Sequence, residues 1–328
     1  MTVPVLRVLT ERYPKTQVTV LSKPFLRPLF KDIPNVTFHA AEVKGKHQGI
    51  LGLYRLYKEL KNLNITHVSD FHNVLRSRVL RSFFSFSSIK IAYIDKGRSE
   101  KKALTKKKNK IFKPLKTSVQ RYADVLEELG YKVLMNQPKA LETKVLTPSI
   151  VKLVGEKSFC WIGIAPFAAF KGKVYPLERM KKVIEQLSKE NLIFLFGGKK
   201  KEIEILTHIS SEFKNTINIA GRLSLEEELR LISHLDVMLS MDSGNAHLSA
   251  MQQVKTVTLW GVTHPYAGFA PFNQPTDYCI LSDRKQYPKI PCSVYGNKIF
   301  EGYDKVMETI QPDTVVQKIE SILRKKSP

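Results

Sequence analysis

The sequence predicts an α/β protein with two doubly wound parallel sheets. Short apolar segments alternate with amphipathic helical segments along almost the whole chain of 328 residues. One short apolar segment, bounded by Asp236 and Asp242, is typical of a parallel strand buried on both sides. The alternation stops near residue 145 and a new series begins near residue 150. We therefore expect two βαβ series, each with its own sheet.

The first series occupies the first 130 residues. Its apolar periodicity predicts helices at 2–13, 50–63, 74–84 and 118–129, and strands at 18–21, 36–38, 67–71 and 89–94. Gly130 ends the last helix as a C-cap residue. The lysine-rich residues 96–116 interrupt the alternation, and we expect them to form a mobile loop.

The second series repeats the pattern. It predicts strands at 160–165, 192–196, 217–220, 235–241 and 255–260, and helices at 176–188, 202–213, 224–234, 244–253 and 313–324. We expect domains at 1–145 and 146–328. In doubly wound domains, ligands sit in the cleft at the carboxyl ends of the strands.

Composition excludes several classes of protein. Hydrophobic residues make up 43% of the chain and charged residues 25%, as in ordinary globular proteins. No apolar run approaches the ~18 residues that a membrane-spanning helix needs, and no signal-peptide pattern is visible. Cys160, Cys279 and Cys292 are far apart and match no metal-ligand spacing. They fit a reducing cytosol without a disulfide framework.

The positive charge is large and uneven. The net charge is +23, and residues 1–150 hold 29 Lys and Arg against 11 Asp and Glu, whereas the remainder holds 24 against 19. Ten of these cations lie between Lys96 and Lys116. We expect the first half to meet a polyanion or an anionic membrane surface. A basic face that serves only solubility is the alternative.

The segment 235–253 carries the clearest chemical signal. An apolar strand ends at Asp242, and a small-residue helix begins at Gly244, so that Asp242 or Ser243 is placed to cap the helix. Free N–H groups at a helix N-terminus favour an anion, and Gly244 lets a phosphate approach the backbone closely. His247 lies in reach of the same ligand. Alternatively, Asp242 is only a cap and His247 a packing or surface histidine.

This stretch, Asp242-Ser243-Gly244-Asn245-Ala246-His247, resembles the signature of glycosyltransferase family 9, the heptosyltransferases of lipopolysaccharide core synthesis. The family pattern is a strand ending in Asp-(Thr/Ser)-Gly-x-x-His, followed by a helix of small residues. The resemblance extends over nearly the whole chain. It implies a GT-B fold, with an acceptor-side domain at 1–145 and a nucleotide-sugar domain at 146–328. It also implies that Asp242, Ser243, Gly244 and His247 bind the donor.

The resemblance implies further donor contacts. The family has a Lys shortly before an aromatic-Pro pair that holds the donor diphosphate. Lys173, in Lys173-Val174-Tyr175-Pro176, matches it, and Lys171 is a near competitor. The family also has a Glu that bonds the ribose hydroxyls after the next strand, and Glu202 is the best match. A purely structural acid at a helix N-terminus is an equal alternative for Glu202.

Other residues have weaker assignments. Arg76 lies at the start of a predicted helix, at the carboxyl end of a strand. The family has a similar stretch that faces the acceptor. The guanidinium of Arg76 is suited to a phosphate or carboxylate of the acceptor. A surface arginine is the alternative. His264, in the segment after the 255–260 strand, could lie over the nucleotide base or be structural.

The resemblance implies an inverting, metal-independent transferase without a cofactor. It would move heptose from ADP-heptose to an anionic lipopolysaccharide core acceptor on the cytoplasmic face of the inner membrane, with residues 96–116 in peripheral contact with that membrane. We expect no nucleic-acid partner, because no nucleic-acid-binding motif is present. The alternatives are a truncated or inactive homologue and a non-catalytic basic protein that binds polyanions or nucleic acid.

The start of the chain departs from the family pattern. The family begins with a strand and a Gly-Asp loop that precede a Thr-x-Pro-x-Leu helix, whereas this chain begins inside that helix at Met1. That Asp is the expected general base, so we expect the catalytic Asp to lie upstream of Met1. Asp70 or His72 would replace it only if the acceptor sat differently. Loss of the first strand is expected to leave two neighbouring strands without a partner.

Overall fold

The structure is a computed structural model that describes residues 1–85, 87–135 and 139–325. It divides into two compact units. Unit 1 comprises Met1–Arg98 and Lys116–Lys139, and unit 2 comprises Ser99–Leu115 and Ala140–Pro328. Unlike the continuous ranges expected from the sequence, these units place residues 99–115 with the second half of the chain.

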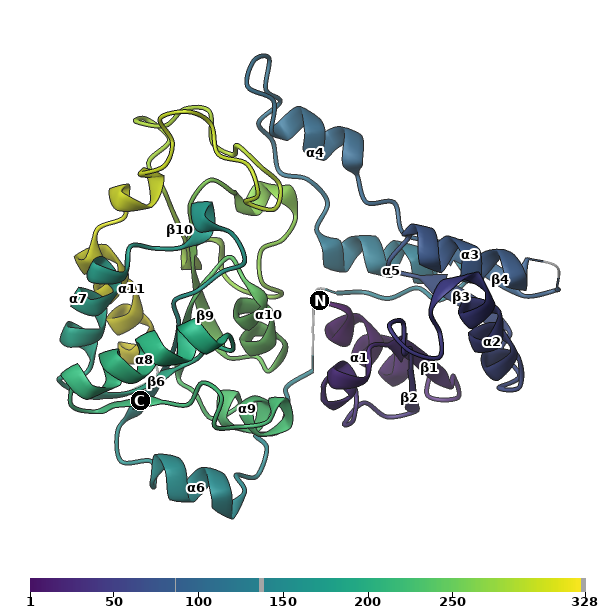
Figure 1. Ribbon diagram of the computed structural model, residues 1–328, viewed down its shortest axis with the longest axis horizontal. Helices are drawn as coiled ribbons and strands as arrows, with labels where there is room; N and C mark the ends of the chain where they lie inside the picture. The colour runs from purple at the N-terminus through teal and green to yellow at the C-terminus, as the bar shows by residue number, and fades with distance from the viewer. Residues whose placement is uncertain (86, 136–138, 326–328) are drawn as a thin grey trace. The chain divides into compact units, whose positions relative to one another are not determined.

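Unit 1 contains every helix and strand expected in its part of the sequence, with small shifts at their ends (Figure 1). Its elements are α1 (Thr2–Arg12), β1 (Val18–Ser22), η1 (Pro24–Leu29), β2 (Val36–Ala40), α2 (Gly49–Lys61), β3 (His67–Asp70), α3 (Leu75–Phe84), β4 (Lys90–Tyr93) and α5 (Ser118–Glu128). Gly130 follows α5 with a φ of 94°, a conformation that favours glycine and confirms the expected helix end.

The strands of unit 1 form two parallel pairs. β1 pairs with β2 and β3 pairs with β4, and within the described ranges no hydrogen-bonded ladder joins β1 to β3. Side chains from both pairs nevertheless enter one hydrophobic cluster. Leu21 of β1 and Val68 of β3 both pack on a core that includes Leu56 of α2 and Phe84 of α3. Helix packing therefore connects strands that backbone hydrogen bonds do not.

Unit 2 also follows the expected pattern. It contains three further elements, α4, α6 and β10, that the sequence did not predict. Its elements are α4 (Arg98–Leu104), α6 (Pro148–Val154), β5 (Cys160–Ala165), η2 (Lys171–Lys173), α7 (Leu177–Leu187), β6 (Asn191–Leu195), α8 (Lys200–Glu212), β7 (Thr216–Asn218), α9 (Leu225–Ile232), β8 (Val237–Met241), α10 (Gly244–Met251), β9 (Lys255–Trp260), η3 (Pro265–Ala267), η4 (Thr276–Tyr278), β10 (Cys279–Leu281), η5 (Val306–Thr309) and α11 (Pro312–Arg324).

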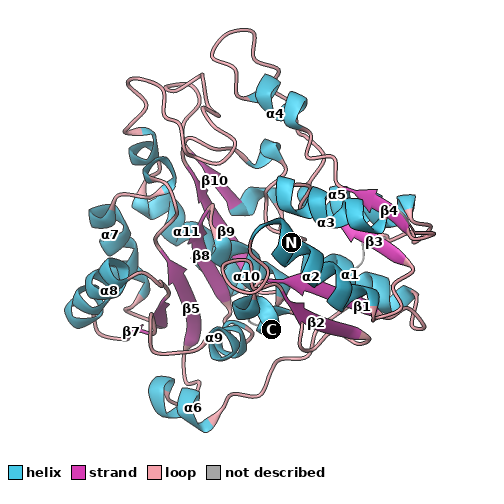
Figure 2. Ribbon diagram, turned by 45° about the vertical axis from the view of Figure 1, so that its right-hand side comes forward, coloured by secondary structure: helices cyan, strands magenta, loops and turns pink. Residues whose placement is uncertain are grey.

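The six strands of unit 2 form one parallel sheet in the order β10-β9-β8-β5-β6-β7. The chain runs outward from β5 to β7, then returns to β8 on the other side of β5 and runs outward again (Figure 2). The strand order therefore reverses between β5 and β8. At such a switch point the two loops after the strands diverge and leave room for a ligand.

Helices cover both faces of this sheet. α7, α8 and α11 pack on one hydrophobic core, which includes Ile164 and Leu239, whereas α6 and α9 pack on another, which includes Trp161 and Met238 (Figure 1). Alternate residues of β5 and β8 thus enter opposite cores, which explains why these segments are apolar throughout. Within the described ranges, no helix is long and apolar enough to cross a lipid bilayer.

Candidate functional site

An ion pair joins the two loops at the switch point of unit 2. Lys173 ends η2 after β5, and Asp242 follows β8 directly. Lys173 Nζ lies 3.0 Å from Asp242 Oδ2, and the side chains are only 12% and 8% exposed. Thr263 Oγ1 donates a second hydrogen bond of 2.9 Å to the same carboxylate oxygen. The loops that follow β5 and β8 are therefore in direct contact.

The side chain of Asp242 has a different role from the predicted helix cap. Ser243, in an extended conformation, is the N-cap residue of α10, and no described side chain caps that helix. Ser243 Oγ instead lies 3.1 Å from Ser240 Oγ. The carboxylate of Asp242 instead contacts the ammonium of Lys173 and the hydroxyl of Thr263.

The N-terminus of α10 is consequently open. Gly244 is exposed, and a Cβ placed on it would meet no described atom within 4 Å. The first N–H groups of a helix have no intrahelical partner, and their dipoles attract negative charge. This turn can therefore hold an anion, with Lys173 and the α10 N-terminus as its two sources of positive potential.

His247 lies in the first turns of α10 and is neutral. Its Nδ1 is buried and has no hydrogen-bond partner among the described residues. Burial lowers the pKa of His247 to about 3, and the nearby charge of Lys173 acts in the same direction. An unpaired polar atom in such a place is costly unless a ligand or water satisfies it. His247 is therefore suited to a hydrogen bond with a bound molecule.

The structure distinguishes Lys173 from Lys171. Lys171, at the start of η2, is exposed, whereas Lys173 is largely buried against Asp242. Gly296 accounts for part of this burial. It has a φ of 85°, and a Cβ on it would lie 2.3 Å from Cδ of Lys173. Sequence patterns do not indicate this contact, because it joins residues far apart in the chain.

Glu202 occupies the first turn of α8, after β6 and the Gly197-Gly198 turn. Its Oε2 accepts hydrogen bonds from the backbone N–H groups of Gly198 (3.1 Å) and Lys199 (3.2 Å). Burial raises its pKa, but these bonds outweigh that effect and the pKa is lowered overall. Glu202 thus performs the structural role that we considered, at the start of the helix that follows β6, the strand next to β5. Its predicted role as a ribose ligand stays a prediction.

Arg76 belongs to a group of cations in unit 1. It is exposed at the start of α3. The pKa of the nearby His72 is lowered by burial and then by Lys96, with Arg76 and Lys23 contributing further, whereas Asp70 opposes them. These positive groups gather where the chain leaves the carboxyl ends of β1, β3 and β4. A cluster of this kind is suited to an anionic ligand.

Asp70 serves the local structure. Its Oδ1 accepts hydrogen bonds from the N–H groups of His72 (2.9 Å) and Asn73 (2.7 Å), and its Oδ2 lies 3.0 Å from Arg81 Nη1. Asp70 is only 8% exposed. Because both oxygens are engaged, Asp70 is poorly placed to accept a proton from a substrate.

Residues 96–116 differ from the mobile loop that we expected. They include the helix α4, and Lys101 and Leu104 of that helix are buried. Lys110 Nζ donates to the carbonyl of Pro291 at 2.6 Å, and Leu115 N donates to the carbonyl of Tyr266 at 2.9 Å. The sequence located the concentration of lysines in this stretch. It did not reveal the buried side chains and backbone hydrogen bonds that anchor it.

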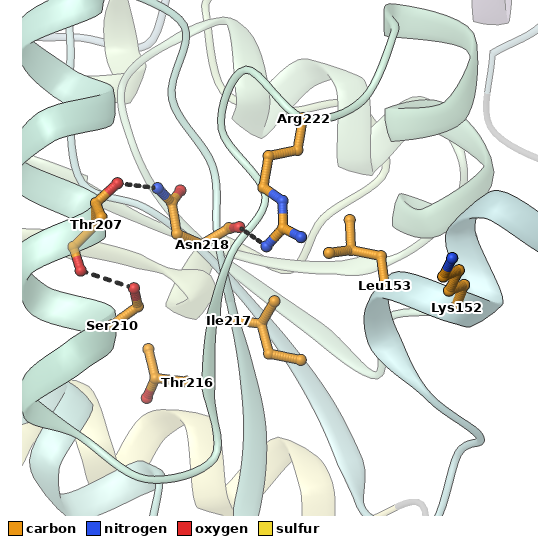
Figure 3. Close-up of a pocket in the computed structure, with 8 residues that line it drawn as sticks. All are labelled: Lys152, Leu153, Thr207, Ser210, Thr216, Ile217, Asn218 and Arg222. Atoms are coloured by element: carbon orange, nitrogen blue, oxygen red, sulfur yellow. Dashed lines mark hydrogen bonds between the residues drawn. The ribbon is translucent and has the colours of Figure 1, made fainter.

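A cavity of about 480 Å³ lies at the β7 edge of the unit 2 sheet (Figure 3). Its lining comprises Lys152, Leu153, Thr207, Ser210, Thr216, Ile217, Asn218 and Arg222. Several of these polar groups bond within the cavity wall, for example Asn218 Nδ2 to Thr207 Oγ1 at 2.9 Å. None of the predicted site residues lines this cavity, and we assign no ligand to it. In the part of the chain that the structure describes, no group of three or more His, Cys, Asp or Glu side chains is placed to hold a metal ion.

The fold is shared with solved heptosyltransferases. The structure of the ADP-heptose LPS heptosyltransferase II of E. coli matches with a TM-score of 0.69, over 100% of this chain and 95% of that chain, at 18% sequence identity. Two Rossmann-like α/β units of this kind constitute the GT-B fold, which confirms the predicted fold class. The chain therefore has the GT-B fold, with the Lys173–Asp242 pair at the switch point of its second sheet.

Sequence comparison specifies the family. The model of glycosyltransferase family 9 (heptosyltransferase) matches residues 53–297. The lipopolysaccharide core heptosyltransferase OpsX of Haemophilus influenzae is 27% identical over 279 residues, covering 82% of this chain and 77% of the relative. The lipooligosaccharide heptosyltransferase 2 of Haemophilus ducreyi is 27% identical over 338 residues, covering 96% and 93%. The chain belongs to glycosyltransferase family 9 and is an enzyme that transfers sugar from a nucleotide sugar.

Proposed function

We propose that this enzyme is an inverting, metal-independent heptosyltransferase that moves heptose from ADP-heptose to a lipopolysaccharide core acceptor. The observation that carries the proposal is the anion site of unit 2. There Lys173, the open N-terminus of α10 and the unpaired Nδ1 of His247 lie at the switch point of the sheet. The relatives support the sugar and the acceptor, since both are named as heptosyltransferases of lipopolysaccharide or lipooligosaccharide.

The proposed reaction builds negative charge on the leaving diphosphate. The acceptor hydroxyl oxygen forms a bond to the anomeric carbon of the heptose while the bond from that carbon to the diphosphate oxygen breaks. The hydroxyl proton passes to a general base, a role that we do not assign to Asp70. Lys173 and the α10 N–H groups stabilise the departing diphosphate, because they are fixed in place before the reaction. In this proposal they perform the task that a metal ion has in other transferases.

ADP is the proposed nucleotide because the matching E. coli enzyme is named for ADP-heptose. The diphosphate would lie between Lys173 and Gly244, with Ser243 and His247 as hydrogen-bond partners. Asp242 would hold the ammonium of Lys173 in place, and its negative charge would partly offset the positive charge of that ammonium. Glu202, one strand further along the carboxyl edge of the sheet, is the proposed ribose ligand. An acceptor phosphate or carboxylate is proposed to bind Arg76 and its neighbouring cations in unit 1.

Titration of the purified chain with ADP tests the donor assignment. We expect ADP to bind, and Lys173→Ala to raise its Kd about tenfold or more, since a phosphate contact to a buried ammonium is worth roughly 1.5–3 kcal/mol. Lys171→Ala is the matched control, because Lys171 lies two residues away and is exposed. Equal Kd values for the two variants would remove Lys173 from the site. Stabilisation by short DNA and not by ADP would contradict the enzyme assignment as a whole.

We also propose that the enzyme works on the cytoplasmic face of the inner membrane and touches anionic lipid through residues 96–116. Lys106, Lys107 and Lys108 are consecutive and exposed, and Ile111 beside them is 54% exposed. Basic residues near an anionic surface contribute about 1 kcal/mol each, and salt screens them. This combination of cations and an exposed apolar side chain is suited to a lipid interface.

Co-sedimentation with vesicles tests this contact. Binding to vesicles that contain phosphatidylglycerol is expected to fall as salt rises, and replacing Lys106, Lys107 and Lys108 by Ala is expected to weaken it about tenfold or more. Replacing Lys199, Lys200 and Lys201 by Ala is the matched control, because these residues are also three consecutive exposed lysines. Equal loss in the two triple variants, or salt-independent binding, would contradict a specific lipid contact.

A further inference from the structure

The segment Ser99–Leu115, here called the basic arm, belongs to unit 2 although it lies in the first half of the sequence. The arm has two kinds of residue. Five of its lysines are exposed, namely Lys102, Lys106, Lys107, Lys108 and Lys113. Three other side chains, Lys101, Lys110 and Phe112, point into unit 2 and contact the loops that carry the donor site. These three are the subject of the inference.

Phe112 packs on the loop that follows β9. Its ring centroid lies 5.0 Å from that of His264 and 4.8 Å from that of Tyr266, and the guanidinium carbon of Arg284 lies 3.4 Å from its centroid. His264 is only 3% exposed, and its Nδ1 accepts a hydrogen bond from the N–H of Tyr266. The residue before His264 is Thr263, which donates to Asp242. Phe112 is thus one residue removed from a direct partner of the donor site.

Lys110 holds the second loop. Its ammonium donates to the carbonyls of Pro291 (2.6 Å) and Leu104 (2.9 Å). Lys110 is partly buried, and this burial lowers its pKa to about 8, with Arg284 acting in the same direction. The residue after Pro291 is Cys292, whose N–H donates to the carbonyl of Val262 at 2.8 Å. Lys110 therefore holds the start of the loop 291–296. The same point of the loop is bonded to Val262, the residue before Thr263.

The same loop ends on Lys173. Ser293 Oγ accepts a hydrogen bond of 3.0 Å from the N–H of Gly296, and Gly296 packs on the stem of Lys173. Lys101 of the arm reaches this end as well. Its Nζ lies 4.4 Å from the ring centroid of Phe269, and that ring lies 5.7 Å from the ring of Tyr295. The arm therefore contacts the start of this loop directly through Lys110, and it is connected to the end of the loop through the ring of Phe269.

We propose that the basic arm is a positioning element of the donor site, in which Phe112 and Lys110 hold the two loops that fix Asp242 and Lys173. The proposal rests on the assignment of these two residues to donor binding. Neither arm residue touches the donor in this proposal, and each acts through a loop. Thr263 orients the carboxylate of Asp242, and Gly296 confines the Lys173 side chain, so a shift of either loop would misplace the ammonium.

Phe112→Ala tests the proposal. We expect the Kd for ADP to rise about fivefold to tenfold, because preorganisation of the ammonium is lost while the ammonium remains. Hydrogen exchange is expected to accelerate in residues 261–265 and 291–297. Phe112→Tyr, which keeps an aromatic ring over Arg284, is expected to restore both readouts. Lys107→Ala is the matched control in the same arm, because Lys107 is exposed, and its Kd is expected to equal that of the unmodified protein.

A second variant covers the case in which Phe112→Ala does not fold. Lys110→Gln removes the bond to Pro291 and is expected to accelerate exchange in residues 291–297 and to raise the Kd for ADP. Unchanged exchange and unchanged Kd in a folded variant would overturn the proposal. If the unmodified protein binds no ADP, the donor assignment fails, whereas exchange in the two loops still decides whether the arm positions them.

Discussion

Gly296 shows how one residue fixes the geometry of the site. Its φ of 85° lies in the left-handed region, and the space where a Cβ would stand is filled by the Lys173 stem. Backbone conformation and packing therefore both require glycine at this position. A single methyl group at position 296 would therefore be enough to disturb the contact with Lys173.

We predict that Gly296→Ala lowers the free energy of unfolding by about 2–3 kcal/mol and weakens ADP binding. Gly302→Ala is the control, because Gly302 also has a positive φ, of 75°, and a Cβ there would meet no described atom within 4 Å. That variant should lose about 1 kcal/mol and retain ADP affinity. Urea denaturation and calorimetric titration measure the two effects. Equal losses would show that contact with Lys173 is unimportant.

His264 makes the stability of the protein depend on pH. Burial lowers its pKa to about 4, and Arg284 and Lys110 act in the same direction. An unfolded chain regains the ordinary pKa of about 6.5, so between these values it binds a proton that the folded chain does not. Stability is therefore complete above pH 6.5 and is lost as the pH falls towards 4.

We predict that His264→Asn reduces this pH dependence. The asparagine side chain can still accept the bond from the Tyr266 N–H, but it does not titrate. The loss of unfolding free energy between pH 7 and pH 5 should be smaller in the variant by about 1–2 kcal/mol. Urea denaturation of both proteins at the two pH values gives the difference. Parallel losses would mean that His264 ionises equally well in the folded and unfolded chains.

At the scale of single elements, α8 and α10 use their N-termini differently. α8 is closed by Glu202, which accepts two backbone N–H groups, whereas among the described side chains none caps α10. α8 follows β6 and α10 follows β8, the two strands that flank β5, so one of these helices has a closed N-terminus and the other an open one. The difference follows from where the nearest carboxylate is held, because Asp242 is paired with Lys173.

We predict that Glu202→Gln separates the two roles considered for this residue. Loss of the charge at the helix N-terminus should cost about 0.5–1 kcal/mol of stability. If Glu202 also binds ribose, the variant should bind ADP more weakly while its affinity for inorganic pyrophosphate stays the same. Calorimetric titration with both ligands measures this. An unchanged affinity for ADP would leave Glu202 with its structural role alone.

At the scale of the whole molecule, the two units differ in how their strands are held. The strand β5 has hydrogen-bonded neighbours on both sides, and its residues are buried except for Cys160 at its start. Every residue of β1 is partly exposed, and its ladder joins it to β2. The backbone hydrogen bonds of unit 1 are therefore more accessible to water than those at the centre of unit 2.

We predict a corresponding order of hydrogen exchange. Amides of β5 and β8 should exchange most slowly, and amides of β1 and β3 should exchange measurably faster, because opening them exposes less buried surface. Exchange measured by mass spectrometry on the full chain gives the order. Equal protection of β1 and β5 would contradict the contrast between a continuous sheet and two strand pairs.

Sequence alone determined the type and order of most elements, because helical and strand periodicities are local properties of the chain. It also located the turn at Asp242-Ser243-Gly244 and the concentration of lysines between Lys96 and Lys116. The helices α4 and α6 and the strand β10 were missed, since all three are short and none has a clear period.

Only the tertiary structure decided which lysine meets Asp242, that Asp242 binds Lys173 and Thr263 and does not cap α10, and that the basic arm belongs to unit 2. It also revealed the contact between Gly296 and Lys173. The physical reason is common to all of these findings. Each depends on the distance between groups that are far apart in sequence, and that distance is set by strand order and core packing, which local patterns of polarity and charge do not specify.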